Sequence, residues 1–252
     1  MQQPLYQQNR HFLKDSIRKT MDFSTTNQSL GLPAPPIQKP YQSNQELIPL
    51  IAPSEFQDLY HINLQDAIRN RQSHRTYSDK PLSLTDLSFL LWATQGIRKR
   101  IDSGHALRTV PSAGARHAFE TYLAVLNVDS LGKGFYRYLP LEHKLVMECL
   151  DNIADRKIAQ ACFSQNWIAK ASVLFMWAAI PERMEWRYGL AAHRVILIDA
   201  GHVCQNLYLA CEAIGAGACA IAAYDQDLID KLLGLDGNNE FTIYTAAVGK
   251  LD

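Results

Sequence analysis

The chain contains 252 residues, of which 47% are hydrophobic and 20% charged, a composition that excludes wholesale disorder. Its 25 Lys and Arg residues balance its 25 Asp and Glu residues, so it has no general electrostatic attraction to nucleic acids or anionic membranes. No apolar run approaches the roughly 20 residues of a membrane span, and the N-terminus lacks the apolar core of a signal peptide. We therefore expect neither a nucleic-acid nor a membrane partner.

The five cysteines are odd in number, and no two of them are spaced as C-x-x-C. This pattern argues against a disulfide framework, a thioredoxin-type motif and a zinc site. Free cysteines are usually buried, and they persist in reducing compartments. We therefore expect a cytoplasmic protein without a bound metal.

The first 55 residues differ in composition from the rest and are predicted to form an extended N-terminal arm, followed by a globular domain over 56–252. Prolines crowd residues 32–40, and because proline fixes φ and disfavours helix, this part is expected to be extended. Apolar residues such as Phe12 and Phe23 give the arm something to bury. Two interpretations remain open, a flexible arm and an arm that wraps a partner subunit.

From residue 62 onward the pattern becomes regular. A helix is expected at 64–68 with Asn63 as its cap, and another at 83–93, where Ser83 and Asp86 have the spacing of a capping box. Strands are expected at 119–128, 171–180, 218–223 and 241–248, a hairpin at 134–138 and 145–147, and helices at 152–161, 184–214 and 225–233. Helices and strands mix without strict alternation, which predicts an α+β fold. The helix over 184–214 is apolar on nearly every side, as in a core or a large interface.

The densest chemical motif is the run Arg71-Gln72-Ser73-His74-Arg75. In an extended segment, residues 71, 73 and 75 lie on one side, which places two guanidinium groups and a hydroxyl together. Such donors suit a phosphate group. The alternative is that the basic residues only complement the negative end of the preceding helix.

Two runs of small residues could admit a ligand close to the backbone. In the first, Pro111-Ser112-Ala113-Gly114, the backbone N–H groups can approach a flat or anionic ligand, although the run could equally be a turn before a strand. In the second, over 215–223, the small side chains would let a planar ring lie against a strand. Neither is a G-x-G-x-x-G dinucleotide fingerprint, and the chain has no Walker A or G-x-S-x-G motif.

Taken in order, these motifs resemble the nitroreductase family of flavin-mononucleotide (FMN) enzymes, most closely the branch of azoline oxidases that form thiazoles and oxazoles in peptides. The resemblance covers about residues 60–250. It rests on Arg71, Ser73 and Arg75, Pro111 to Gly114 with Glu120, Leu90 to Gly96, Arg187-Tyr188-Gly189, Asp199 to His202 with Gln205-Asn206-Leu207, Tyr244, and Val248-Gly249.

The resemblance implies an α+β fold with a central mixed or antiparallel sheet flanked by helices, a homodimer with the long helix at its core, and FMN at the dimer interface. By this resemblance, Arg71, Ser73 and Arg75, with Gln72 in the same run, would hold the phosphate and ribityl chain. Pro111, Ser112, Ala113 and Gly114 would meet the flavin of the other subunit, and Ala220, Ile221, Ala222 and Ala223 would lie beside the ring with N–H groups facing N5. Lys250 stands near the position of a late basic residue for the phosphate.

The candidate catalytic residues are Tyr188 and Arg187, at the position where azoline oxidases carry a Lys-Tyr pair. Arginine is effectively always protonated and makes a poor base, so Tyr188 is the candidate acid or base. The leading hypothesis is an FMN-dependent oxidoreductase that passes hydride from NAD(P)H to a small electron-poor acceptor. The alternatives are a peptide azoline dehydrogenase within a peptide-maturation complex, and a non-catalytic flavin-binding protein.

Overall fold

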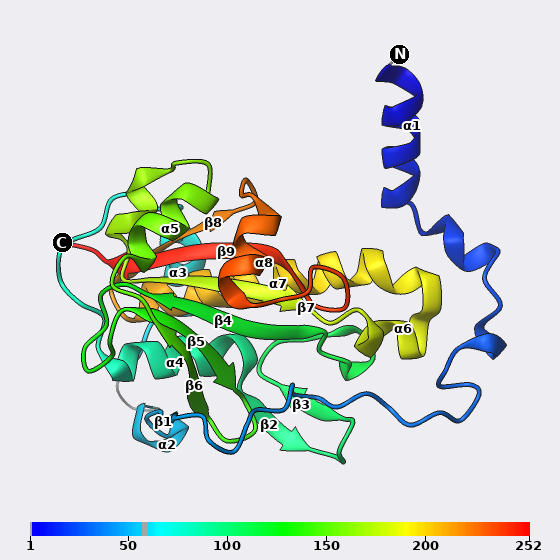
Figure 1. Ribbon diagram of the computed structural model, residues 1–252, viewed down its shortest axis with the longest axis horizontal. Coiled ribbons are helices and arrows are strands. Elements are labelled where there is room, and N and C mark those ends of the chain that lie inside the picture. Colours follow the sequence, from blue (N-terminus) through cyan, green and yellow to red (C-terminus); the bar gives the residue numbers. More distant parts are fainter. Residues whose placement is uncertain (1, 57–59) are drawn as a thin grey trace.

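A computed structural model describes residues 2–56 and 60–252. Its centre is a seven-stranded antiparallel sheet in the order β1-β6-β5-β4-β7-β9-β8, with helices packed on both faces (Figure 1). The strands are β1 (Leu47–Pro49), β4 (Phe119–Val125), β5 (Gly134–Leu139), β6 (Lys144–Leu150), β7 (Val173–Ala179), β8 (Ala216–Ile221) and β9 (Phe241–Lys250). The expected α+β fold with a helix-flanked sheet is confirmed.

The helices of the described chain are α1 (Gln2–Leu13), α2 (Pro53–Phe56), α3 (Leu64–Asn70), α4 (Leu84–Gln95), α5 (Ala154–Ala161), α6 (Glu182–Tyr188), α7 (Ala192–Ala213) and α8 (Gln226–Leu233). Both predicted caps are present. The Asn63 side chain accepts a hydrogen bond from the Gln65 N–H, and Ser83 and Asp86 form a reciprocal capping box. Local hydrogen bonds therefore fix where α3 and α4 begin.

The two faces of the sheet carry separate cores. Along β4, Leu123 and Val125 pack with α4 and α7 on one face, whereas Tyr122 and Ala124 pack with α5 and α8 on the other. Every residue of β4 and β7 is buried, as the apolar run over 171–180 predicts for a strand covered on both sides.

The single helix expected over 184–214 is in fact two helices. Gly189 adopts φ +49° and ψ −133°, outside the helical region, and a short 3₁₀ turn at Gly189–Ala191 separates α6 from α7. The helix α7 is also not buried all round. One face packs on the sheet, while Leu197 and Ile198 on the other remain about half exposed in the single chain.

The N-terminal arm lies largely against its own chain. The helix α1 stands away from the body, but the segment after it runs along the domain toward β1 (Figure 1). Buried side chains hold this segment by its carbonyl groups: Trp186 Nε1 donates to Leu32 O at 2.9 Å, and Arg108 donates to Ile37 O at 2.6 Å. Strand β1, within the predicted arm, pairs with β6. Leu32, Ile37 and β1 of the arm are thus held against the domain, whereas wrapping of a partner subunit and the domain boundary at 55 stay predictions.

A second, two-stranded sheet consists of β2 (Ile97–Arg100) and β3 (Ala106–Arg108), which the sequence pattern did not predict. Within the described ranges, no helix is long and apolar enough to cross a membrane.

Candidate functional site

The segment Arg71–Arg75 lies along the outer edge of β8. The His74 N–H donates to the Ala218 carbonyl at 3.0 Å, and Ser73 pairs with Ala218 in a parallel bridge. Gly217 allows this approach because a Cβ at that position would collide with the His74 side chain. The extended segment is therefore held beside the strand that the sequence proposed for the flavin ring.

Tyr208, on α7, connects this segment to β8. Its hydroxyl lies 2.9 Å from Ser73 Oγ and accepts a hydrogen bond from the Ala220 N–H at 2.8 Å. The guanidinium of Arg71 lies over the Tyr208 ring, 5.2 Å from its centroid. One side chain thus positions two members of the Arg-Ser-Arg trio.

Arg75 occupies the other side of Ser73. Its guanidinium lies 6.0 Å from the ring centroid of Trp167, in the 3₁₀ turn Asn166–Lys170. Burial raises the pKa of the Cys219 thiol, while Arg75 and a hydrogen bond with Ser73 oppose the rise. Arg75, Ser73 and Arg71 therefore gather around Cys219 and Tyr208, while Gln72 is exposed between them.

The trio fits an anionic group. Among the described residues, neither Arg71 nor Arg75 forms an ion pair with a carboxylate, so the two guanidinium charges of this segment have no compensating anion. Converging guanidinium and hydroxyl donors are what a phosphate binds. The donor chemistry of this segment thus suits the phosphate end of FMN.

Two of the predicted cofactor contacts need correction. Lys250 forms an ion pair with Asp86 at 3.0 Å and donates to Ile214 O at 2.6 Å, so its charge is compensated within the chain. The N–H of Ala220 donates to Tyr208 and is not free for flavin N5. Strand β8 ends at Ile221, which leaves Ala222 and Ala223 exposed beyond the strand rather than within it.

The run Pro111–Gly114 forms a separate half of the site, held by Asp199 of α7. The Ala113 N–H donates to Asp199 Oδ2 at 3.2 Å, and the Ser112 side chain also hydrogen-bonds this carboxylate. Burial raises the pKa of Asp199, although these two hydrogen bonds oppose the rise. Ser112 Oγ in turn accepts a hydrogen bond from the His117 N–H at 2.9 Å, which fixes the turn.

Tyr188 and Arg187 border this turn. Gly114 has φ +58°, and a Cβ there would lie 2.7 Å from the Tyr188 hydroxyl and 2.9 Å from Arg187 Nε. The Tyr188 ring also has Arg187 and Arg18, a residue of the N-terminal arm, at 5.6 and 5.8 Å from its centroid. The structure therefore brings the candidate catalytic pair together with the run Pro111–Gly114.

The segment Arg71–Arg75 and the turn Pro111–Gly114 contact α7 at different positions along its axis, which we call the levels of Tyr208 and Asp199. Asp199 and Tyr208 are nine residues apart on α7, which corresponds to about 13 Å along the helix axis. On the exposed side of α7, Leu197 and Ile198 lie next to the level of Asp199, and Gly201 lies between the two levels. A single chain therefore presents two half-sites along α7, with an exposed apolar surface next to the half-site at Asp199.

Sequence reasoning missed three residues of this arrangement. Tyr208 follows the Gln-Asn-Leu motif that supported the resemblance, but nothing in its spacing indicates a bond to Ser73, 135 residues away. Asp199 belongs to the run Asp199 to His202 that supported the resemblance, but the sequence indicated no role for its carboxylate. No sequence pattern indicates Arg18 as a site residue, because its contact with Tyr188 depends on the path of the N-terminal arm.

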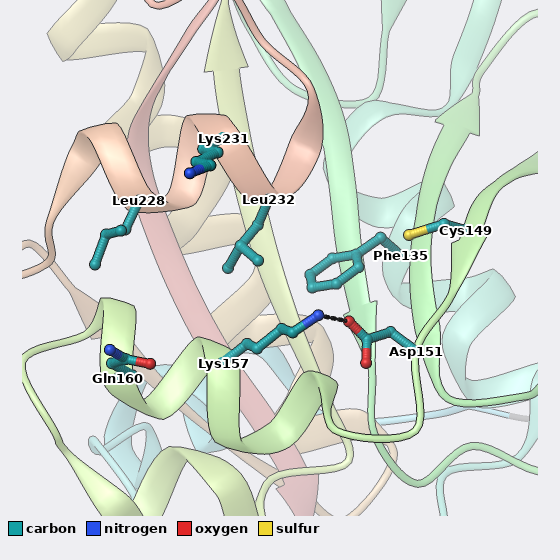
Figure 2. A pocket seen from close by; sticks show the side chains of 8 residues that line it. All are labelled: Phe135, Cys149, Asp151, Lys157, Gln160, Leu228, Lys231 and Leu232. Atoms are coloured by element: carbon teal, nitrogen blue, oxygen red, sulfur yellow. Dashed lines mark hydrogen bonds and ion pairs between the residues drawn. The ribbon is translucent and has the colours of Figure 1, made fainter.

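The molecule also has a cavity of about 450 Å³ between α5, α8 and the sheet (Figure 2). Its lining includes Phe135, Cys149 and Leu232, and Lys157 forms an ion pair across it with Asp151 at 2.5 Å. The cavity contains none of the predicted site residues, and it opens on the face of the sheet opposite α7. We therefore place the candidate site at α7.

Comparisons with known proteins identify the family of the chain. Residues 68–250 match the sequence model of the Nitroreductase family. A protein of Methanocaldococcus jannaschii named as a nitroreductase is 33% identical over 193 residues, which cover 77% of this chain and 93% of that protein. The microcin B17-processing protein McbC of Escherichia coli is 26% identical over 54% of this chain, which spans about half, 51%, of McbC. A crystal structure of a nitroreductase-fold protein from Ralstonia eutropha has a TM-score of 0.67 and 23% identity over 88% of this chain and 99% of that one.

Proposed function

The chain belongs to the nitroreductase family, and from this premise we propose that it is an FMN-dependent oxidoreductase that passes hydride from NAD(P)H to a small electron-poor acceptor. The observation that carries the proposal is the uncompensated trio of Arg71, Ser73 and Arg75 beside the edge of β8. The five unpaired cysteines are consistent with a reducing, cytoplasmic setting.

The proposed cofactor site is the half-site next to Tyr208 of α7. Arg71, Ser73 and Arg75 would bind the phosphate and ribityl chain, and the end of β8 at Ile221 would lie beside the ring. Ala222 and Ala223, beyond the strand, would take the place of Ala220 in facing N5. FMN supplies the hydride chemistry, and the protein supplies binding, orientation and hydrogen bonds.

The proposed active unit is a homodimer. The turn Pro111–Gly114 lies about 13 Å along α7 from the level of the Arg-Ser-Arg trio, and in the proposed dimer the turn of the second chain would meet the flavin. The half-exposed Leu197 and Ile198 on α7 offer an apolar surface for that second chain. Tyr188, beside the turn, would then reach the substrate bound over the ring.

The cofactor assignment is tested by titrating FMN into the purified protein and following flavin absorbance and fluorescence. Arg71→Gln and Arg75→Gln should each weaken FMN binding about tenfold or more, because each removes charge-assisted hydrogen bonds to the phosphate. Arg69→Gln is the matched control, since Arg69 is exposed and already paired with Asp66. A wild-type protein that remains colourless and binds no added FMN would overturn the proposal.

A second candidate function is azoline oxidation in a peptide. It is favoured by the similarity to McbC, a microcin-processing protein, and by the position of Tyr188 beside Gly114. When an azoline is oxidised, the ring loses a hydride to the cofactor and a proton to a base, and Tyr188 is the candidate acid or base for this step. Tyr188→Phe should then abolish aromatisation while FMN stays bound. Unchanged aromatisation would reject this role for Tyr188.

A further inference from the structure

We propose that Arg18 and Arg187, whose guanidinium groups both lie near the ring of Tyr188, form a subsite that binds the carboxylate of the substrate. The proposal rests on the proposed function, because it assigns the substrate class of the same site. It also gives the N-terminal arm a role, since Arg18 belongs to the arm and reaches the site from outside the family-matched residues 68–250.

Both guanidinium groups lie near the ring of Tyr188, the residue that we propose reaches the substrate. Arg187 and Arg18 lie 5.6 and 5.8 Å from the centroid of the Tyr188 ring, and Arg187 also borders Gly114. Tyr188 and Arg187 are only partly buried, and Gly114 is exposed, so a ligand can reach them. Arginine presents a planar fork of donors that matches a carboxylate.

The surroundings leave this subsite positively charged. In the described chain, Arg187 has no ion pair with a carboxylate. The buried Arg116 gives its hydrogen bonds to the carbonyl groups of Arg183 and Gly104 and keeps one guanidinium nitrogen without a partner. Arg183 is neutralised by the buried Glu120.

The pKa values of these groups agree with this charge balance. Burial, together with the charges of Arg183 and Arg187, lowers the pKa of Arg116. Burial alone would raise the pKa of Glu120, but Arg183 and Arg137 hold it below its ordinary value. The Glu120 carboxylate is therefore paired with Arg183 and Arg137. It does not compensate the charge of Arg187, which is available to a ligand.

The arm holds Arg18 in place from two directions. Asp15 accepts a hydrogen bond from Arg18 Nε at 2.9 Å, within the 3₁₀ turn Asp15–Lys19. That turn is tied to α7, because Arg194 Nε donates to Leu13 O at 2.8 Å and the Arg194 guanidinium lies 3.6 Å from Asp15. Asp15 partly compensates Arg18, so Arg187 is expected to contribute the larger share of the binding.

The direct test is calorimetric titration of the purified protein with benzoate and with benzamide, its uncharged counterpart. The wild-type protein should bind benzoate more tightly than benzamide, and added NaCl should weaken only the benzoate binding. Arg187→Gln and Arg18→Gln should each weaken benzoate binding, by about tenfold for Arg187→Gln. Arg18→Lys keeps the charge and should retain most of the affinity.

Arg156→Gln is the matched control, because Arg156 is an exposed arginine on α5 away from this site. It should leave both affinities unchanged. Equal affinity for benzoate and benzamide in the wild-type protein, or benzoate binding that is unaffected in both Arg18→Gln and Arg187→Gln, would overturn the subsite.

A kinetic readout separates the subsite from the proposed function. With NAD(P)H saturating, the ratio of KM for 4-nitrobenzoate to KM for 4-nitrobenzamide should rise about tenfold in Arg187→Gln, whereas a defect in flavin chemistry changes both acceptors together. Preserved turnover with an unchanged ratio would reject the subsite and leave the oxidoreductase intact. Absence of FMN binding, with benzoate still bound through Arg187, would reject the oxidoreductase instead.

A second binding experiment, with peptides, identifies the source of the carboxylate. A short peptide with a free carboxyl terminus is compared with its amidated form. Discrimination between these two, lost in Arg187→Gln, would place a peptide terminus in the subsite. Binding of benzoate without such discrimination would place a small carboxylate there.

Discussion

The hydroxyl of Tyr208 lies 2.9 Å from Oγ of Ser73, and the two residues are 135 positions apart in the chain. Because the Tyr208 oxygen already accepts the Ala220 N–H, its own proton can complete the bond to Ser73. The Ser73 proton then remains for another acceptor, and in this structure Ser73 hydrogen-bonds the weakly accepting thiol of Cys219. A phosphate oxygen would be the stronger acceptor at this position.

Replacing Tyr208 with Phe should therefore weaken FMN binding without removing any proposed direct contact. We expect a loss of about tenfold, the effect of one buried hydrogen bond to a residue that itself binds an anion. Fluorescence titration with FMN measures it. Tyr136→Phe is the control, because it removes a tyrosine hydroxyl on β5 that donates to Gly132 O, away from the proposed FMN site. Equal FMN affinity in the wild-type protein and Tyr208→Phe would contradict this role.

Gly114→Ala should disturb the turn that holds the candidate catalytic pair. The residue has φ +58°, and its new Cβ would collide with the Tyr188 hydroxyl and Arg187. We expect a loss of about 1–3 kcal/mol in the free energy of unfolding and a fall in kcat, measured by chemical denaturation and steady-state kinetics.

Gly234→Ala separates the backbone cost of a positive φ from the cost of a collision with neighbouring side chains. Gly234 has a similar φ of +67° but open space around its Cβ position. It should show the backbone cost alone and leave kcat unchanged. A normal kcat in Gly114→Ala would show that the turn does not constrain Tyr188.

The stability of the protein should fall as the pH drops below about 6.5, and His117 should account for part of the fall. Burial and the nearby Arg108 lower the pKa of His117 to about 2. The unfolded chain binds a proton near the ordinary histidine pKa of about 6.5, whereas the folded chain does not, so acid favours unfolding by up to about 1.4 kcal/mol per pH unit.

Urea denaturation between pH 7.5 and 5, at fixed protein concentration, measures this slope. His117→Gln should give a shallower slope than the wild-type protein. His61→Gln, at an exposed histidine, should give the wild-type slope. Identical slopes in all three proteins would exclude His117 as the source.

Leu197→Glu should weaken the proposed dimer, because it places a charge on the exposed apolar side of α7. Light scattering should give twice the 28.4 kDa of one chain for the wild-type protein and a concentration-dependent shift toward the single-chain mass for the variant. Leu150→Glu is the control, since Leu150 is similarly exposed on β6. A wild-type protein with the mass of one chain would contradict the dimer.

Features set by neighbouring residues could be read from the sequence. The caps at Asn63 and Ser83 depend on hydrogen bonds within three residues, and the buried strand β7 shows as a continuous apolar run. For the same reason, the run Arg71–Arg75 could be recognised as an extended segment, whereas the placement of its donors on one side stays a prediction. These patterns fixed the fold class and pointed to an anion-binding segment.

The arrangement of the site was decided by contacts between distant residues. The path of the arm depends on Trp186 and Arg108 bonding to backbone carbonyl groups, which leave no residue-type pattern to read. Likewise, the capture of the Ala220 N–H by Tyr208, the pairing of Lys250 with Asp86 and the approach of Arg18 to Tyr188 follow from packing. Spacing along the chain carries local backbone preferences, whereas these partners meet only after the sheet and α7 have packed together.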